Sequence, residues 1–399
     1  MILAGDYIPK QKAVRLYLPP STILANLEGP ILCDHIPTPS PKVGPSLFSR
    51  AFDLGGRPFI FALANNHMMD YGVDGLEVTK TMLTKAGVPF CGAGANLEEA
   101  RAPLIVTESG KKIGVISCCE RQFGCAETAR SGVAEKGLWL VDAVKELKQS
   151  VDFVIVSCHA AFEHSPFPSP RLRDFYHLLI HVGADVIHGH HAHVPQGWET
   201  YRDGLILYGL GNFVVDPCLW QAQNHRWAIV VQLDFTGDRI KWTPDFTDIG
   251  LDGSIITVKP SQGVEREQHM RYCEIANRVF ADASLLQAYW QAACVELFDR
   301  LYGVALKSPR YAETKSLTLR NRARYLYDGL GEVLSSLLGR KLRSKRSLAH
   351  GLLLLNLFQC ESHADVISTA LGVLSGLEAD RRTPDVKDAV EWMKIGQVE

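Results

Sequence analysis

The sequence predicts an α/β fold over residues 1–259, followed by an all-helical extension over residues 260–399. In the first part, short runs rich in β-branched residues alternate with amphipathic stretches, which is the pattern of βαβ units. The composition changes at residue 259, because residues 1–259 contain 17 of the 20 prolines and 24 of the 33 glycines. A chain of 399 residues has room for two such units at about 150 residues per domain.

The first part is expected to alternate strands and helices in chain order. Apolar runs near the amino terminus predict strands at 2–4 and 23–25. The periodic segments that follow predict, in order, a strand at 58–63, a helix at 74–86, strands at 88–91 and 151–158, a helix at 171–181 and a strand at 185–188. Hairpins are expected across Ser109-Gly110, between 104–108 and 112–117, and across Gly237-Asp238, between 229–235 and 240–242. The sheet is therefore expected to be mixed, and the proline-rich stretch 36–45 to be an extended or mobile loop.

The second part carries helical periodicity. Apolar residues recur at three- and four-residue spacing over 279–297 and again over 325–337, which predicts four to six helices in all. Amphipathic helices need a surface on which to bury their apolar face, so we expect the extension to dock on the α/β part and to help shape the entrance of a site. The basic cluster 340–346 predicts a solvated face or, alternatively, an anionic surface contact.

Composition excludes several classes of protein. The 42 basic and 44 acidic side chains give a net charge of −2, which provides no overall electrostatic attraction to nucleic acid. The longest apolar run, at 351–358, is far shorter than the roughly 20 residues of a membrane span, so no transmembrane segment is expected. The first residues lack a basic region followed by an apolar one, and the ten cysteines lack the spacing of zinc ribbons or a disulfide framework. These features favour a cytoplasmic protein.

Histidines gather in one region of the chain. Eight of the fourteen lie within 35 residues, at positions 159, 164, 177, 181, 188, 190, 191 and 193. His191 and His193 directly follow a predicted strand, and α/β folds place their sites at the carboxyl ends of strands. A loop can direct these two imidazoles at one cation. The alternative interpretation is a polar surface turn.

Other predicted strands also end in residues of ligand type. Asp6 follows the first strand, Glu28 follows the second, Asn66 and His67 follow the strand at 58–63, and His159 follows the strand at 151–158. This mixture of oxygen and nitrogen donors suits Mn²⁺, Fe²⁺ or Zn²⁺ better than Ca²⁺ or Mg²⁺. We therefore predict a transition-metal site. Asp70 and Tyr71 are expected to cap the next helix, and Asn212 to support the site through hydrogen bonds or to form a turn.

The motifs occur in an order that resembles a known family. They are Gly-Asp at 5–6, Asn-Leu-Glu-Gly at 26–29, Ala-Asn-Asn-His-x-x-Asp-Tyr-Gly at 64–72, His-x-x-x-Glu at 159–163, Gly-x-His-x-His-Val at 189–194 and Tyr-x-x-Gly-Asn-Phe at 208–213. This order resembles the CapA-type capsule and poly-γ-glutamate synthesis family, within the calcineurin-like metallophosphoesterase superfamily. The resemblance implies a two-sheet α/β/β/α sandwich with a metal site at the strand ends.

The resemblance also implies roles for individual residues. The implied metal ligands are Asp6, Glu28 as a bridging carboxylate, Asn66, His159, His191 and His193. His67 resembles the histidine that polarises the substrate oxygen. Glu163 is expected to orient a ligand histidine or to act as an acid or base, with a plain surface carboxylate as the alternative. The Asp-x-His start of the phosphoesterase superfamily is Asp6-Tyr7-Ile8 in this chain, so one metal position has fewer ligands, as in the CapA-type branch generally, and either one or two ions are expected.

The sequence thus predicts a metal-dependent hydrolase that cleaves a phosphoester or amide bond during biosynthesis of an extracellular polymer or peptide. Its substrate is expected to be a small molecule, peptide or polymer, and no nucleic-acid partner is expected. One alternative is a metal-dependent peptide epimerase, since the same site can acidify a Cα–H. Another alternative is a non-catalytic accessory protein of a polymer-assembly complex.

Overall fold

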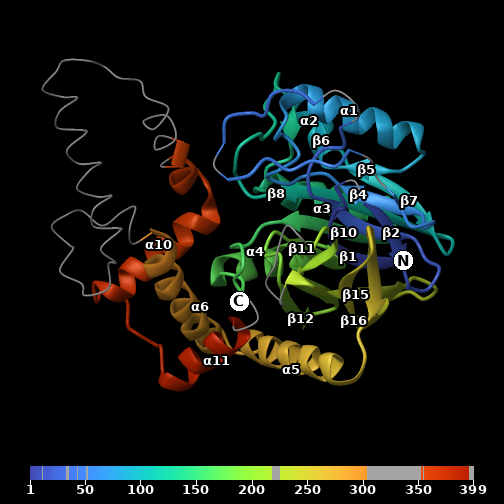
Figure 1. The fold of residues 1–399 in the computed structure, drawn as a ribbon. Helices are drawn as coiled ribbons and strands as arrows, with labels where there is room; N and C mark the ends of the chain where they lie inside the picture. Colours follow the sequence, from blue (N-terminus) through green and yellow to red (C-terminus); the bar gives the residue numbers. More distant parts are fainter. Residues whose placement is uncertain are drawn as a thin grey trace, which may run out of the picture.

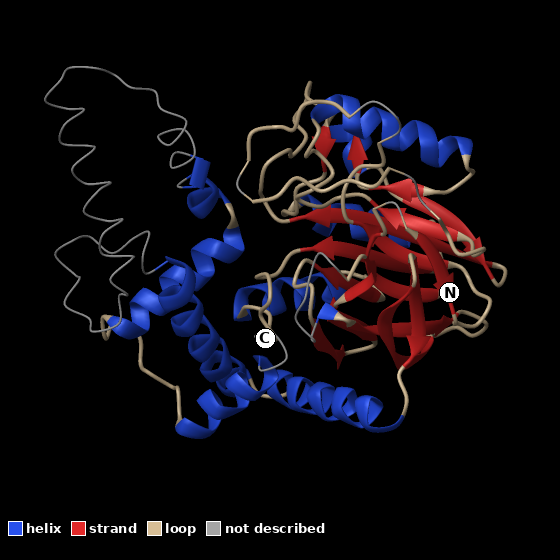
Figure 2. Ribbon diagram, in the orientation of Figure 1, coloured by secondary structure: helices blue, strands red, loops and turns tan. Residues whose placement is uncertain are grey.

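The computed structural model describes residues 1–10, 12–32, 36–42, 44–50, 53–217, 225–302, 352–353 and 355–394 (Figure 1). The basic cluster 340–346 and the predicted helical segment 325–337 lie outside the described residues. Strands form the body of the molecule, and helices flank it and continue into the carboxyl-terminal part (Figure 2). The described fold is a two-sheet sandwich followed by helices.

A nine-stranded mixed sheet contains the amino terminus. Its strands are β1 (Ile2–Ile8), β2 (Ala13–Leu16), β3 (Ile23–Leu27), β4 (Phe59–Ala62), β5 (Phe90–Cys91), β14 (Asn212–Val215), β15 (Trp227–Asp234), β16 (Lys241–Asp252) and β17 (Ile255–Pro260). They run in the order β2-β17-β16-β15-β1-β3-β4-β5, and β14 also pairs with β1. Because β1, β3, β4 and β5 are parallel, their carboxyl ends lie along one edge of the sheet.

The second sheet has six strands in the order β12-β13-β11-β10-β8-β7. These are β7 (Leu104–Glu108), β8 (Lys111–Cys119), β10 (Phe153–His159), β11 (Val186–His190), β12 (Pro195–Tyr201) and β13 (Gly204–Leu210). The central strands β8, β10, β11 and β13 are parallel and fully buried over most of their length, as expected for a sheet covered on both faces. A small ribbon pairs β6 (Ala93–Gly94) with β9 (Gly132–Val133).

Helices cover the outer faces of the two sheets. They are α1 (Gly72–Lys85), α2 (Leu97–Arg101), α3 (Trp139–Lys148) and α4 (Pro170–His181). Side-chain alternation in β1 defines the layers: Leu3 packs in the core between the sheets, whereas Ile2 and Ala4 pack in a second core with Leu76 of α1. On the other side, α3 contacts β10, and α4 contacts β11 and β13. The architecture is therefore the expected α/β/β/α sandwich.

The sequence-based elements agree with this fold. The strands at 58–63, 151–158 and 185–188 are confirmed as β4, β10 and β11, and the helices at 74–86 and 171–181 as α1 and α4. Both hairpins are confirmed as antiparallel pairs, β7 with β8 and β15 with β16. The strand predicted at 2–4 is longer in the structure, so Asp6 lies inside β1 at a register irregularity rather than after the strand.

The carboxyl-terminal helices dock on the sandwich, as expected. They are α5 (Gly263–Phe280), α6 (Ala283–Leu297), the π-helical turn η2 (Phe298–Tyr302), α10 (Glu361–Leu374) and α11 (Pro384–Lys394). In Figure 1, α5 runs beneath β12, and α6 lies beside α4. The Tyr272 hydroxyl donates to the Pro195 carbonyl at 2.8 Å, and the ring of Phe280 packs 4.4 Å from that of Tyr208. None of the described helices combines the length and hydropathy needed to cross a bilayer.

Candidate metal centre

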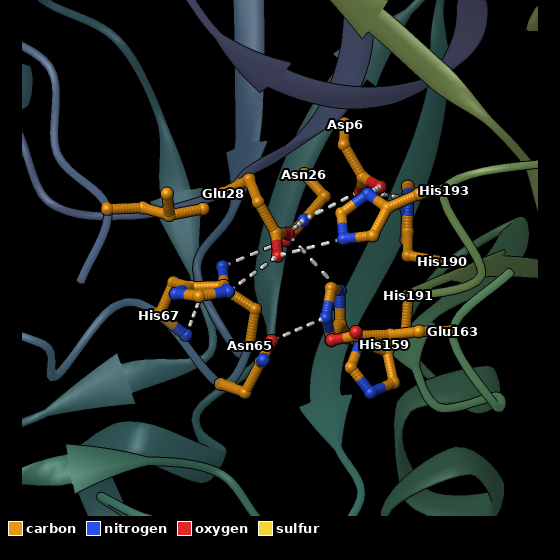
Figure 3. A network of polar contacts seen from close by, with 12 residues as sticks. Asp6, Asn26, Glu28, Asn65, His67, His159, Glu163, His190, His191 and His193 are labelled. Carbon is orange, nitrogen blue, oxygen red and sulfur yellow. Dashed lines mark hydrogen bonds and ion pairs between the residues drawn. The ribbon is translucent and has the colours of Figure 1, made fainter. Parts of the chain in front are cut away.

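The polar residues at the strand ends converge on one region between the two sheets (Figure 3). Asp6 comes from β1, Glu28 directly follows β3, and His159 ends β10. His191 and His193 lie in the turn after β11, at φ angles of 86° and 56°. Left-handed backbone at a residue with a Cβ costs about 1–3 kcal/mol and is typical of functional sites. Two such histidines in one turn are therefore held there by the surrounding fold.

Close packing of glycines allows these strands to meet. A Cβ atom added to Gly5 would lie 1.8 Å from the Gly211 carbonyl oxygen, and one added to Gly189 would lie 2.1 Å from the Tyr208 carbonyl oxygen. No side chain fits at either position without a shift of backbone. Gly5 thus brings Asp6 of β1 against the strand that follows Gly211, and Gly189 brings the β11 turn to the same place.

Two groups of candidate ligand atoms lie in this region. The first comprises Asp6, Glu28 and His159, and the second comprises Glu163, His191 and His193, with the ligand atoms of each group all within 4.8 Å of one another. The groups adjoin, since His193 Nδ1 lies 3.1 Å from Asp6 Oδ2 and His193 Nε2 lies 3.9 Å from Glu28 Oε1.

The donors in this region fit a divalent transition metal. Glu28 Oε1, His159 Nδ1 and His191 Nδ1 are buried and have no hydrogen-bond partner among the described residues. A buried polar atom without a partner is unfavourable unless something else satisfies it, and a cation would do so here. Carboxylate oxygens mixed with imidazole nitrogens are the ligands that Zn²⁺, Mn²⁺ and Fe²⁺ accept.

Asn66 lies at the edge of the group of ligands, because its side-chain oxygen is 2.9 Å from His159 Nε2. The structure therefore brings together all six residues predicted as ligands. It also brings His67 close to them, with His67 Nε2 at 3.9 Å from Glu28 Oε1. Glu163, the other predicted acid or base, is half-exposed and belongs to the second group of candidate ligands.

The closely packed charges at this site shift the pKa values of its carboxylates and imidazoles. Burial and the neighbouring Asp6 carboxylate raise the pKa of Glu28 to about 8. Burial acts to lower the pKa of His193, but the hydrogen bond and charge of Asp6 outweigh it and raise that pKa to about 10. Burial acts to raise the pKa of Glu163, yet the charges of His191 and other imidazoles lower it to about 2. Without a cation, the cluster thus retains protons on Glu28 and His193 at neutral pH.

His67 is held by an ion pair behind its ring. Its Nδ1 lies 2.7 Å from Asp70 Oδ2 and 3.0 Å from Lys42 Nζ, and Lys42 forms a buried ion pair with Asp70 Oδ1. Burial lowers the pKa of His67, as does the charge of Lys42, whereas Asp70 raises it. When Asp70 accepts the Nδ1–H, Nε2 is left as an acceptor facing Glu28.

Asp70 therefore does not act as predicted. Helix α1 begins at Gly72, with Tyr71 as its N-cap and no side-chain capping bond. The Asp70 carboxylate instead accepts from His67, Lys42 and the Leu47 backbone N–H, the last at 2.7 Å. Tyr71 is the N-cap residue as expected, but the expectation for Asp70 was wrong because one nearby donor and two donors from the 42–47 segment surround its carboxylate.

Buried amides support the charged residues. Asn26 donates to Asp6 Oδ1 at 2.9 Å and also to Glu28, and Asn65 donates to Asn26 Oδ1 at 3.0 Å. The expectation that Asn212 supports the site is confirmed, since its side-chain oxygen lies 3.0 Å from His193 Nδ1. These amides fix the carboxylate and imidazole positions before any ligand binds.

The sequence analysis missed several contributors. His190 Nδ1 lies 3.3 Å from Asp6 Oδ1, and Glu120 Oε1 lies 3.2 Å from His191 Nε2. Both follow the rule that located the other residues, because His190 ends β11 and Glu120 directly follows β8. Lys42 lies in a loop without apolar period, so no local pattern indicates its role.

Comparison with known proteins finds a family match over part of the chain. Residues 22–217 match the family model described as "Bacterial capsule synthesis protein PGA_cap". This part of the chain is a CapA-type domain. The matched range contains every predicted site residue except Asp6, and it ends before the carboxyl-terminal helices of this chain.

Two curated relatives and one solved structure illustrate the similarity. The chain is 34% identical over 174 residues to "Probable polyglutamine synthesis accessory protein MT0602" from Mycobacterium tuberculosis, covering 40% of this chain and 46% of the relative. It is 30% identical over 164 residues to "Capsule biosynthesis protein CapA" from Bacillus anthracis, covering 39% and 40%. The alignments thus span less than half of each relative. A Mycoplasma pneumoniae phosphatase structure aligns at a TM-score of 0.36 and 13% identity, covering 68% of this chain and 95% of that one.

Proposed function

We propose that this CapA-type chain is a metal-dependent hydrolase that cleaves a phosphoester or amide bond during the biosynthesis of an extracellular polymer or peptide. The proposal depends on one observation above all. Asp6, Glu28 and His159 bring three ligand atoms within 4.8 Å of one another in a buried site, and two of these side chains carry atoms without a hydrogen-bond partner among the described residues.

A divalent transition metal bound here would supply Lewis acidity and lower the pKa of water from about 16 toward about 7. Asp6, Glu28 and Asn66 would bind it through oxygen, and His159, His191 and His193 through nitrogen. One or two ions of Mn, Fe or Zn suit this set. Asn26 would keep the Asp6 and Glu28 carboxylates in position through the hydrogen bonds described above.

His67 is the proposed acid and base. Its Nε2, which faces Glu28, would take a proton from the attacking water while Asp70 holds Nδ1. The imidazolium that results is paired with the Asp70 carboxylate, and it returns the proton to the leaving oxygen or nitrogen. Glu163 is the second candidate acid or base, because it lies beside His191 and His193.

The test uses purified protein and simple chromogenic substrates. Bis-p-nitrophenyl phosphate reports phosphoester cleavage, and γ-glutamyl-p-nitroanilide reports amide cleavage, each with and without added Mn²⁺ or Zn²⁺. We expect metal-dependent turnover of one substrate class, lost in Asp6→Ala and preserved in Ser368→Ala, an exposed position on α10. Metal binding without turnover of either class would contradict the hydrolase proposal.

A non-catalytic role is the second candidate, and it is favoured by the name of the Mycobacterium tuberculosis relative, which calls that protein an accessory protein. That role predicts that the chain supports polymer synthesis equally well with His67 replaced by alanine. The epimerase alternative predicts deuterium incorporation at a peptide Cα in D₂O. The hydrolase proposal instead predicts that the substrate bond is cleaved by water.

A further inference from the structure

A helix outside the family match reaches the metal centre through one carboxylate. Helix α10 begins at Glu361 with Cys360 as its N-cap, some 240 residues after β8 in the chain. The Ser362 hydroxyl donates to Glu120 Oε1 at 2.9 Å, and the Cys360 thiol lies 3.3 Å from the same oxygen. On its other side, Glu120 Oε1 lies 3.2 Å from His191 Nε2. A continuous chain of polar contacts therefore links α10 to a proposed metal ligand.

The contact with Glu120 decides which nitrogen of His191 is available. Nε2 lies 3.2 Å from Glu120 Oε1 and 3.0 Å from the Gln122 side-chain nitrogen, which itself donates to Glu120 Oε1 at 2.8 Å. Nδ1, in contrast, is buried without a hydrogen-bond partner among the described residues. A carboxylate behind an imidazole fixes the tautomer and the ring orientation, and it makes the opposite nitrogen a better metal ligand. When Glu120 accepts the Nε2–H, the lone pair is left on His191 Nδ1, the buried nitrogen without a partner among the described residues.

Helix α10 is anchored at this place by further contacts with the sandwich. Lys136 forms an ion pair with Glu361, and Arg171 forms one with Asp365 at 2.8 Å. The ring of His363 packs edge-on at 5.4 Å against Phe162, in the segment that links His159 to Glu163. These contacts fix the position of Ser362 relative to Glu120. A cavity of about 190 Å³ lies at the same junction, bordered by Glu120, Ser362 and Trp290.

We propose that Ser362 of α10 is a positioning residue for the metal centre, acting through Glu120 on His191. The carboxyl-terminal helices thereby complete the surroundings of a site whose proposed ligands all come from the sandwich. This inference rests on the proposed metal-binding function and adds a requirement for the helical extension. It concerns the geometry of a ligand rather than contact with substrate.

The test measures Co²⁺ binding by the full chain, by competition with a chelating dye and by the visible absorption bands of bound Co²⁺. Removal of a group that contacts a metal ligand weakens metal binding by about 10- to 100-fold. Ser362 contacts Glu120 and not the ligand itself, so we expect Ser362→Ala to weaken Co²⁺ binding by about tenfold. Glu120→Gln should weaken it at least as much and change the absorption bands. Ser362→Thr, which keeps the hydroxyl, should bind Co²⁺ as the wild type does.

The matched control is Ser368→Ala, the same substitution on the exposed face of the same helix, where the hydroxyl bonds only locally to the Asp365 carbonyl. It should leave affinity and spectrum unchanged. The melting temperature of the metal-free proteins separates positioning from folding. If Ser362→Ala lowers that temperature but binds Co²⁺ with wild-type affinity and spectrum, or changes neither, the proposal is overturned. A wild-type protein that binds no Co²⁺ overturns the metal centre itself, and this proposal with it.

Discussion

The buried ion pair behind His67 offers a test that does not depend on bound metal. Only 7% of the Lys42 side chain and 1% of the Asp70 side chain are exposed. Asp70→Asn removes the charge that Lys42 pairs with and weakens the contact to His67 Nδ1. Breaking a buried ion pair from one side costs about 3–5 kcal/mol, because the remaining charge stays in a poorly solvated place.

Lys42 and Asp70 differ in the hydrogen bonds that each retains when the other is replaced. After Lys42→Met, Asp70 still accepts from His67 and from the Leu47 backbone N–H, each at 2.7 Å. After Asp70→Asn, Lys42 Nζ retains the Asn66 carbonyl at 3.4 Å and His67 Nδ1 at 3.0 Å. We therefore expect Lys42→Met to cost less, about 1–3 kcal/mol, as for a single lost hydrogen bond to a charge. The double variant should be more stable than the sum of the two losses predicts.

Thermal unfolding of the metal-free protein measures this cycle. At about 2 °C per kcal/mol for a domain of this size, Asp70→Asn should lower the melting temperature by about 6–10 °C. The double variant should recover part of that loss, with a coupling of at least about 1 kcal/mol, but not the activity that depends on the held orientation of His67. Strictly additive losses would refute the argument, because they would mean that Lys42 and Asp70 do not interact in solution.

Four further predictions follow from the site and the extension. Elemental analysis should find less bound transition metal in the His191→Ala, His193→Ala double variant than in wild type, and equal metal content would contradict the ligand assignment. His67→Ala should keep the metal but lower turnover by about 10²- to 10⁴-fold, whereas joint loss of metal and activity would make His67 a ligand. The pKa of His193 is raised to about 10, and a metal ion binds only the neutral ring, so the affinity for metal should increase with pH through the neutral range. Calorimetry in buffers of different ionisation enthalpy should detect the release of at least one proton on binding. Deleting residues 260–399 should expose the apolar surface under α5 and α6 and cause aggregation in light scattering, whereas a monomeric, metal-binding and fully active 1–259 fragment would make the extension an independent module.

Local patterns in the sequence were sufficient to predict most strands and helices of the fold. A strand such as β10 begins with a continuous apolar run because both of its faces are buried, and such a run is visible without tertiary information. The same local rule located the candidate ligands. Polar residues directly after a parallel strand reach one edge of that strand's sheet, so His159 and His191 of the second sheet could be predicted to meet, whereas their approach to Glu28 of the first sheet depends on how the two sheets pack.

The tertiary structure decided the features that depend on residues far apart in the chain. The partner of Asp70 is Lys42, from a loop without period, and the residue that holds Glu120 is Ser362, 242 positions away. Neither contact leaves a local pattern, because a hydrogen bond depends on where two surfaces dock rather than on the spacing within either segment. The same is true of the His191 ring, whose available nitrogen is set by Glu120 across two strands. The sequence by itself determined which donors reach each sheet edge, and the packing of the sheets and of α10 determined which of them meet and how each is directed.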